Sequence, residues 1–215
     1  MTLQNIIFDW DGTLARSMKH WLTGYRSQLE VRGLSFTPRQ IVDEFFYDHD
    51  TISDRHPLLD FPVMIKQVKT QVQAGLGSVA LYEGSDDVLM ALKTQLLSVS
   101  LVTSSPRHML MRGMSGHQVE HHFDHIICGD DGFGHKPEPG PFAEILKRTG
   151  ALANETLIIG DSQADILGGK AAGCHTCLFT PPENALYHDF DTLKQLNPDY
   201  VIDHLPLLVD VFNSH

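Results

Sequence analysis

The chain has 215 residues and a mass of 24.0 kDa, of which 42% are hydrophobic and 20% charged; it can bury one large core, with or without a small insert. A net charge of −11 without any block of Lys or Arg argues against nucleic acid and against an anionic membrane surface as partners. We expect a cytoplasmic protein: residues 3–8 are too short for a signal peptide, no stretch reaches the roughly 18 apolar residues of a membrane span, and three cysteines suit a reducing compartment.

The first predicted strand ends in two aspartates. Ile6, Ile7 and Phe8 predict a buried strand, so Asp9 and Asp11 lie at its carboxyl end, where open α/β sheets bind their ligands. Two neighbouring carboxylates are costly unless a cation or hydrogen-bond donors accompany them. The pair indicates one nucleophile or metal ligand and one general acid/base. A solvated Asp-rich turn is the alternative reading of these residues taken alone.

The pattern then changes to helices without strands. Residues 17–31, 38–46 and 62–74 each read as a helix, the second preceded by Thr37 and Pro38 as capping signals. We therefore expect a helical domain over residues 15–81, inserted into a core formed by residues 1–14 and 82–215.

Strands and helices alternate through the rest of the chain. Short β-branched runs at 98–102, 125–128, 156–159, 176–179 and 200–202 predict strands that are covered on both faces, as in a parallel sheet. Helices are expected at 85–95, 140–149, 163–172 and 187–196. This order predicts an α/β fold with a doubly wound, Rossmann-like core. The CxxC formed by Cys174 and Cys177 is expected to be buried structure rather than a redox or zinc site.

Polar residues follow two of these strands in positions that suit phosphate. Thr103, Ser104 and Ser105 precede a helix expected after Pro106, where hydroxyls and backbone N–H groups can cradle a phosphate or simply cap the helix. Lys136 stands in a proline-rich loop that holds it in place, so it can neutralise a phosphoryl group as a point charge.

A second carboxylate pair follows the strand at 156–159. Asp161 stands at the strand end and Asp165 one helical turn later, so both lie on the same side. Such an oxygen-rich site suits Mg²⁺, which takes one or two carboxylates together with waters and a substrate phosphate. The alternative is an N-cap aspartate followed by a first-turn aspartate.

Together these motifs resemble a known superfamily. The sequence DWDGT at residues 9–13, the strand end at Thr103, the loop at Lys136 and GDSQAD at 160–165 are similar to the four motifs of the haloacid dehalogenase superfamily, in order. The helical insertion resembles the small α-helical cap of the phosphoglycolate phosphatase and β-phosphoglucomutase branch. The resemblance implies a Rossmann-like core with a helical cap, and a hydrolase of phosphate esters.

The resemblance also implies roles for single residues. Asp9 would attack phosphorus and become the aspartyl-phosphate, while Asp11 would act as general acid/base and lend its backbone carbonyl to Mg²⁺. Asp161 would bind the metal directly and Asp165 through water. The residues expected to hold the phosphoryl oxygens are Asp9, Gly12, Thr103, Ser104 and Lys136; those expected to form the metal site are Asp9, Asp11, Asp161 and Asp165.

Within the superfamily, two positions favour hydrolysis of phosphate esters. A dehalogenase needs neither Asp11 nor a metal, and mutases of this type carry Glu at the position of Gly160. We therefore predict an Mg²⁺-dependent phosphatase acting on a small phosphorylated metabolite, phosphoglycolate-like or a sugar phosphate. The alternatives are a β-phosphoglucomutase-like phosphotransferase, a phosphonatase with a cap lysine, and a non-catalytic binding module. Neither the identity of the phosphoester nor the oligomeric state follows from the sequence.

Overall fold

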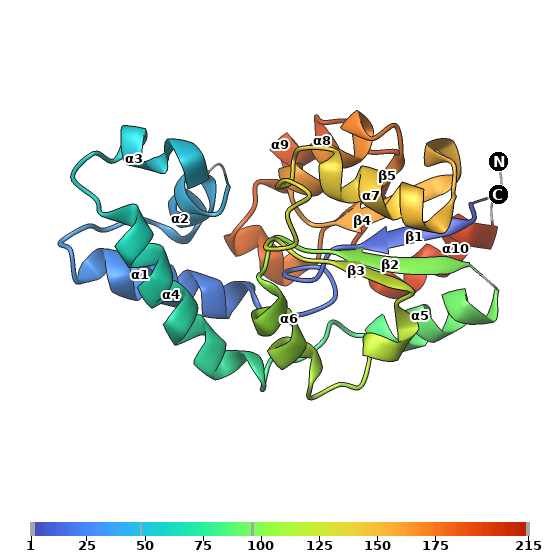
Figure 1. Ribbon diagram of the computed structural model, residues 1–215, viewed down its shortest axis with the longest axis horizontal. Helices are drawn as coiled ribbons and strands as arrows, with labels where there is room; N and C mark the ends of the chain where they lie inside the picture. The colour runs from blue at the N-terminus through green and yellow to red at the C-terminus, as the bar shows by residue number, and fades with distance from the viewer. Residues whose placement is uncertain (1–2, 48, 96, 214–215) are drawn as a thin grey trace.

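The computed structural model describes residues 3–47, 49–95 and 97–213. Within these residues, six parallel strands form one sheet in the order β3-β2-β1-β4-β5-β6 (Figure 1). The strands are β1 (Asn5–Phe8), β2 (Ser98–Val102), β3 (His125–Ile127), β4 (Thr156–Gly160), β5 (His175–Phe179) and β6 (Tyr200–Ile202). In the register of the sheet, Ile7 of β1 pairs with Ser100 on one side and Ile158 on the other. The strand that carries Asp9 therefore lies between β2 and β4, where the strand order reverses, and this is where open α/β sheets bind ligands.

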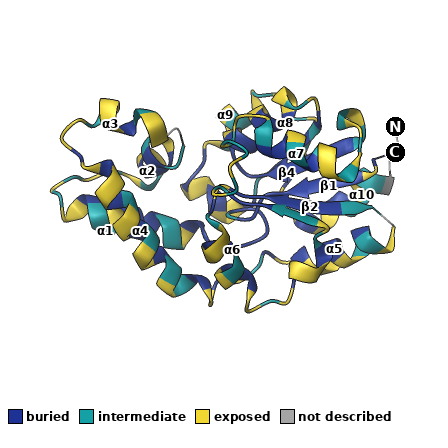
Figure 2. Cartoon of the chain, viewed as in Figure 1, coloured by how far each residue is buried: buried dark blue, intermediate teal, exposed yellow. Residues whose placement is uncertain are grey.

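The four inner strands, β2, β1, β4 and β5, are buried on both faces, and this explains their apolar sequences (Figure 2). Ile6 and Phe8 belong to the larger apolar cluster on one face, and Ile7 belongs to the smaller cluster on the other. Successive side chains of β1 thus point to opposite faces, as strand geometry requires.

Helices cover the two faces. On the face of the smaller cluster lies α7 (Gly140–Thr149), and α8 (Gln163–Ala171) approaches β4 and β5 closely through Gly169. The larger cluster includes residues of α5 (Ser85–Thr94), α6 (Arg107–Met114) and α10 (Leu208–Asn213). Shorter elements complete this part: α9 (Phe190–Lys194) and the 3₁₀ turns η2 (Glu120–His122), η3 (Ala153–Glu155), η4 (Pro182–Leu186) and η5 (Leu205–Leu207). The fold class predicted from the sequence, a parallel α/β sheet flanked by helices, is confirmed.

Among the described residues between β1 and α5, the regular elements are all helices: α1 (Met18–Glu30), α2 (Pro38–Phe45), η1 (His49–Thr51), α3 (Ile52–Arg55) and α4 (Phe61–Leu76). They extend from one end of the sheet, and α1 runs beside α4 (Figure 1). Helix α2 begins with a capping box in which the Thr37 hydroxyl accepts from the backbone N–H of Gln40.

The segments that enter and leave these helices lie side by side. Ala15 and Leu81 form an antiparallel bridge, the Arg16 N–H donates to the Ala80 carbonyl at 2.9 Å, and the Tyr82 N–H donates to the Leu14 carbonyl at 2.9 Å. We call residues 14–16 and 80–82 the two linkers. The chain therefore enters and leaves the helical segment at one place.

Some expected elements differ in the structure. The helix expected at 187–196 is shorter, because the Asp189 side chain caps α9 and the helix begins at Phe190. Helices α3 and α10 were not expected from the sequence. Cys174 and Cys177 are buried as predicted, and both are free thiols. Among the described helices, none combines the length and the apolar character needed to cross a membrane.

Candidate active site

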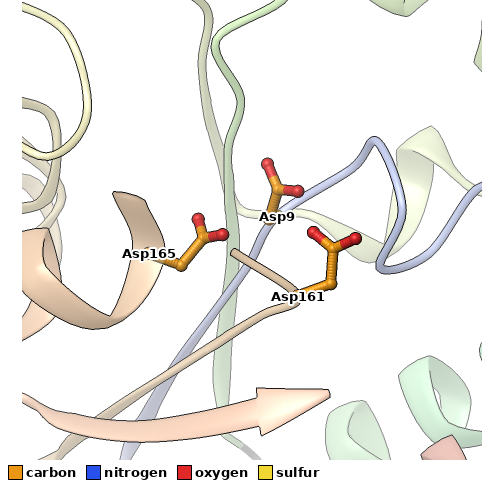
Figure 3. A group of neighbouring side chains, drawn as sticks. All are labelled: Asp9, Asp161 and Asp165. Atoms are coloured by element: carbon orange, nitrogen blue, oxygen red, sulfur yellow. The ribbon is translucent and has the colours of Figure 1, made fainter. Parts of the chain in front are cut away.

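Three buried carboxylates meet at the carboxyl end of the sheet. Asp9 follows β1, Asp161 follows β4 and Asp165 lies in the first turn of α8 (Figure 3). Each offers one oxygen within 4.8 Å of the other two, and their exposed fractions are 6%, 1% and 1%. Three buried anions so close together repel one another and lack water, so they require cations or donors.

Lys136 is the cation nearest to this cluster. Its Nζ lies 2.6 Å from Oδ1 of Asp9 and 2.7 Å from Oδ1 of Asp165, and it also donates to the Val102 carbonyl at 3.3 Å. Burial lowers the pKa of Lys136, but the charges of Asp165 and Asp9 outweigh burial and raise the pKa overall. The lysine therefore stays protonated and offsets one of the three negative charges.

Asp165 is held by the start of its own helix. Its Oδ2 accepts from the Ser162 hydroxyl at 2.6 Å and from the Ser162 N–H at 3.3 Å, in a capping box, while Oδ1 binds Lys136. A Cβ atom at Gly160 would overlap the Asp165 side chain. Asp165 therefore both caps its own helix and belongs to the acidic cluster.

Asp161 is bound by two residues outside the sequence motifs. Its Oδ2 accepts from Nδ2 of Asn184 at 2.9 Å and from Nε2 of His188 at 3.1 Å. Burial raises the pKa of Asp161, and His188 opposes this rise. Burial likewise raises the pKa of Asp9 well above the ordinary aspartate value, against the effect of Lys136. Without a further cation the cluster therefore favours taking up a proton.

The Asp11 carboxylate is held by donors outside the cluster formed by Asp9, Asp161 and Asp165. Its Oδ1 accepts from the Ser17 hydroxyl at 2.5 Å and from the Trp21 indole N–H at 3.0 Å. Its Oδ2 accepts from the Ser105 hydroxyl at 2.6 Å. The donors lie in α1 (Trp21), at the residue that precedes α1 (Ser17) and in the loop after β2 (Ser105), and none of the three is a charged group.

The other predicted phosphate-binding residues differ in their burial and contacts. Thr103 is buried and its hydroxyl oxygen accepts from the Ser105 N–H at 3.0 Å, whereas Ser104 is exposed. Gly12 has a φ of +85°, and a Cβ at this position would overlap the Asp161 carboxylate. Only glycine therefore fits at position 12, where the backbone passes next to the Asp161 carboxylate.

Sequence reasoning missed several contacts in this region. Asn184, His188 and Trp21 were not singled out, because isolated polar or aromatic residues carry no spacing signal. Tyr47, which follows α2, also lies near the acidic cluster: burial first, then the charges of Asp161 and Asp165, raise its pKa well above the ordinary tyrosine value. Arg16, at the start of the inserted segment, pairs with Glu183 at 3.2 Å.

The donor set suits a hard divalent cation. Three carboxylates faced by one lysine leave excess negative charge in a buried place, and carboxylate oxygens are the ligands that Mg²⁺ prefers. With such a cation bound, Asp9 would be kept ionised beside Lys136, and an anion beside a fixed cation is the arrangement that phosphoryl transfer requires.

Comparison with known proteins agrees with this chemistry. Residues 6–179 match the family model described as haloacid dehalogenase-like hydrolase. The pyrophosphatase PpaX of Halalkalibacterium halodurans is 27% identical over 215 residues, covering 98% of this chain and 97% of that protein. The phosphoglycolate phosphatase of Aliivibrio fischeri is 32% identical over 133 residues, covering 62% of this chain and 57% of that protein. A solved Lactobacillus plantarum structure, assigned as a phosphoglycolate phosphatase, has a TM-score of 0.84 at 24% identity and covers 99% of this chain and 100% of that chain.

Proposed function

The chain belongs to the haloacid dehalogenase-like hydrolase family and is a phosphatase, and we propose that it hydrolyses a small phosphomonoester with Mg²⁺ through an aspartyl-phosphate. The observation that carries this proposal is the contact of 2.6 Å between Lys136 and Asp9 inside a cluster of three buried carboxylates. A nucleophilic carboxylate, a fixed cation and a second acid two residues away are the groups that this reaction needs.

In the first half-reaction, a carboxylate oxygen of Asp9 attacks phosphorus and the bond between phosphorus and the ester oxygen breaks. Asp11 gives its proton to the leaving oxygen, which departs as an alcohol. In the second half-reaction, Asp11 removes a proton from water, the water oxygen attacks phosphorus, and the bond to Asp9 breaks to release phosphate. Lys136 and the Thr103 hydroxyl hold the phosphoryl oxygens in both halves.

The proposed metal site consists of Asp9, Asp161 and the backbone carbonyl of Asp11, with Asp165 acting through water. A bound Mg²⁺ would supply positive charge to the phosphoryl oxygens and screen the repulsion between them and Asp9. We also propose that the helical segment over residues 15–81 is a cap domain that selects the substrate, because its residues Ser17 and Trp21 contact Asp11.

Two other activities compete with this proposal. The full-length similarity to a pyrophosphatase favours an inorganic pyrophosphate substrate as a second candidate. Phosphate is a weaker base than an alkoxide and leaves with less need of a proton, so Asp11→Asn would spare pyrophosphate hydrolysis more than ester hydrolysis. A phosphotransferase of the β-phosphoglucomutase type is disfavoured, because Gly160 has no room for a side chain beside Asp165.

A panel of phosphate compounds tests the proposal. Phosphoglycolate, sugar monophosphates, p-nitrophenyl phosphate and pyrophosphate would be assayed for released phosphate, with Mg²⁺ and with EDTA. We expect metal-dependent release from at least one monoester, and loss of at least a thousandfold in kcat for Asp9→Asn, as for other removed nucleophiles. Folded wild-type protein that releases phosphate from none of the compounds would refute the function, and an active Asp9→Asn variant would refute the nucleophile.

A further inference from the structure

One short segment supplies both side-chain donors that bind Asp161. Asn184 in η4 and His188, which follows it, donate to the same oxygen, Oδ2, at 2.9 and 3.1 Å. Both donors are buried, with exposed fractions of 1% and 6%. Within the described residues, the hydrogen bonds to the Asp161 side chain all reach Oδ2, and Oδ1 receives none.

The surroundings of Asn184 fix which way its amide points. Two acceptor oxygens, the Gly12 carbonyl at 3.0 Å and Oδ2 of Asp161, lie on its Nδ2 side. On the other side its Oδ1 accepts from the Tyr82 hydroxyl at 2.6 Å. A flipped amide would set Oδ1 against two acceptors, so the NH₂ group must face Asp161. The donor to Asp161 is therefore preset by the fold.

The segment is also tied to the inserted helices. Arg39 of α2 donates to the carbonyls of Ala185 at 3.3 Å and His188 at 3.2 Å, and it pairs with Asp189 at 3.6 Å. Tyr82 belongs to the second linker. Residues 182–189 thus contact the helical insertion on one side and Asp161 on the other.

We propose that Asn184 and His188 are positioning residues that hold Asp161 by Oδ2 and so preset Oδ1 as the ligand oxygen for the divalent cation. The inference rests on the proposed function, since it assumes that Asp161 binds Mg²⁺. A carboxylate with two free oxygens rotates and loses orientation, whereas one that is fixed at a single oxygen presents the other in one direction. Removal of such supporting donors typically weakens metal binding by 10- to 100-fold.

Calorimetric titration with Mg²⁺, without substrate, tests the proposal. We expect Asn184→Leu and His188→Leu each to raise the dissociation constant for Mg²⁺ by about 10- to 100-fold. His188→Gln keeps an amide donor and is expected to recover part of the loss. Tyr82→Phe leaves both donors to Asp161 in place and is expected to change the constant less than Asn184→Leu does. Glu183→Gln, in the same segment but exposed and paired with Arg16, is the matched control and is expected to bind as the wild type.

The results distinguish failure of the positioning role of Asn184 and His188 from failure of the proposed function. If wild-type protein binds Mg²⁺ and the folded leucine variants bind it equally well, the positioning role is wrong while the proposed function stands. If wild-type protein binds no Mg²⁺, the proposed function fails and the positioning role fails with it. Circular dichroism shows whether each variant is folded. If Asn184→Leu does not fold, the double variant with Tyr82→Phe takes its place, because it also removes the hydroxyl that would lose its acceptor.

Discussion

The indole N–H of Trp21 donates a hydrogen bond to Oδ1 of Asp11 over 3.0 Å. Trp21 lies in α1, among the inserted helices, whereas Asp11 follows the central strand of the sheet. The proposed general acid/base is therefore held partly by the segment that we propose as the cap, and any shift of α1 relative to the sheet changes the surroundings of this carboxylate.

Trp21→Phe tests this relationship. The substitution keeps an aromatic ring but removes the donor, and we expect kcat to fall about tenfold, equivalent to ~1.4 kcal/mol, with little change in KM. Steady-state kinetics on the best substrate measure both constants. Thr23→Ala, an exposed change on the same helix, serves as the control. An unchanged kcat would mean that Trp21 does not position Asp11.

Lys136→Met is expected to lower both activity and stability. It removes the only charge that faces Asp9 and Asp165 in ion pairs within the described residues and leaves two buried carboxylates unpaired. Loss of one partner from a buried pair costs about 3–5 kcal/mol, which corresponds to roughly 10 °C in unfolding temperature for a chain of this length. Lys147→Met, at an exposed pair with Glu144, should change stability by less than about 0.5 kcal/mol. Thermal melting of the two variants compares them directly.

Metal removal and pH are expected to act together on Asp161. Its pKa is raised in the folded protein above the usual 3.8, chiefly by burial. Without metal, the contribution of protonated Asp161 to the free energy of unfolding is therefore fully present below the pKa of this residue in the unfolded chain. It is lost as the pH rises through the pKa of Asp161 in the folded protein. In EDTA, Asp161→Asn should gain unfolding temperature relative to wild type between pH 3.5, which lies below the ordinary aspartate pKa, and pH 7.5, by about 3 °C for each unit of raised pKa.

Added Mg²⁺ should reverse this trend, because wild type binds the cation and Asp161→Asn loses a ligand. Melting curves at both pH values, with and without Mg²⁺, provide the comparison. A difference between variant and wild type that is the same at both pH values in EDTA would contradict the raised pKa.

Gly160→Ala is expected to disturb the site through Asp165. The added Cβ would overlap the Asp165 side chain, which must then move away from Lys136. We expect a destabilisation of about 1–3 kcal/mol, as in other overpacked sites, and a fall in kcat of at least tenfold. Gly77→Ala, where a Cβ meets open space, is the control. A fully active Gly160→Ala variant would show that Asp165 has room to shift without loss of function.

Much of the fold follows from local patterns in the sequence. The strand at 98–102 and the strand at 200–202 have the bounds expected from their apolar runs. The first is buried along most of its length, whereas the second is an edge strand with Val201 exposed. The parallel sheet then brings its carboxyl ends together, so Asp9, Asp161 and Lys136 become neighbours although they lie far apart in the chain. Motif spacing and sheet topology were sufficient for this part of the site.

The supporting residues could not be found in this way. Asn184 and His188 reach Asp161 from a turn and an irregular segment, and their alignment depends on packing against Tyr82 and Gly12 rather than on any periodicity. The sequence instead suggested a helix from residue 187, which the cap at Asp189 shortens. The orientation of Asp11 toward Ser17 and Trp21 is likewise a product of tertiary contact.

The bridge between Ala15 and Leu81 makes the helical segment a replaceable module. Its two ends leave the sheet region side by side, so a different segment with closely spaced ends can be grafted between these residues without altering the register of β1 against β2 and β4. In such a chimera the carboxylate cluster and Lys136 would come from one parent and the proposed cap from the other. Because Ser17 and Trp21 of this segment also hold Asp11, a grafted segment would have to supply two such donors to keep the proposed general acid/base in place.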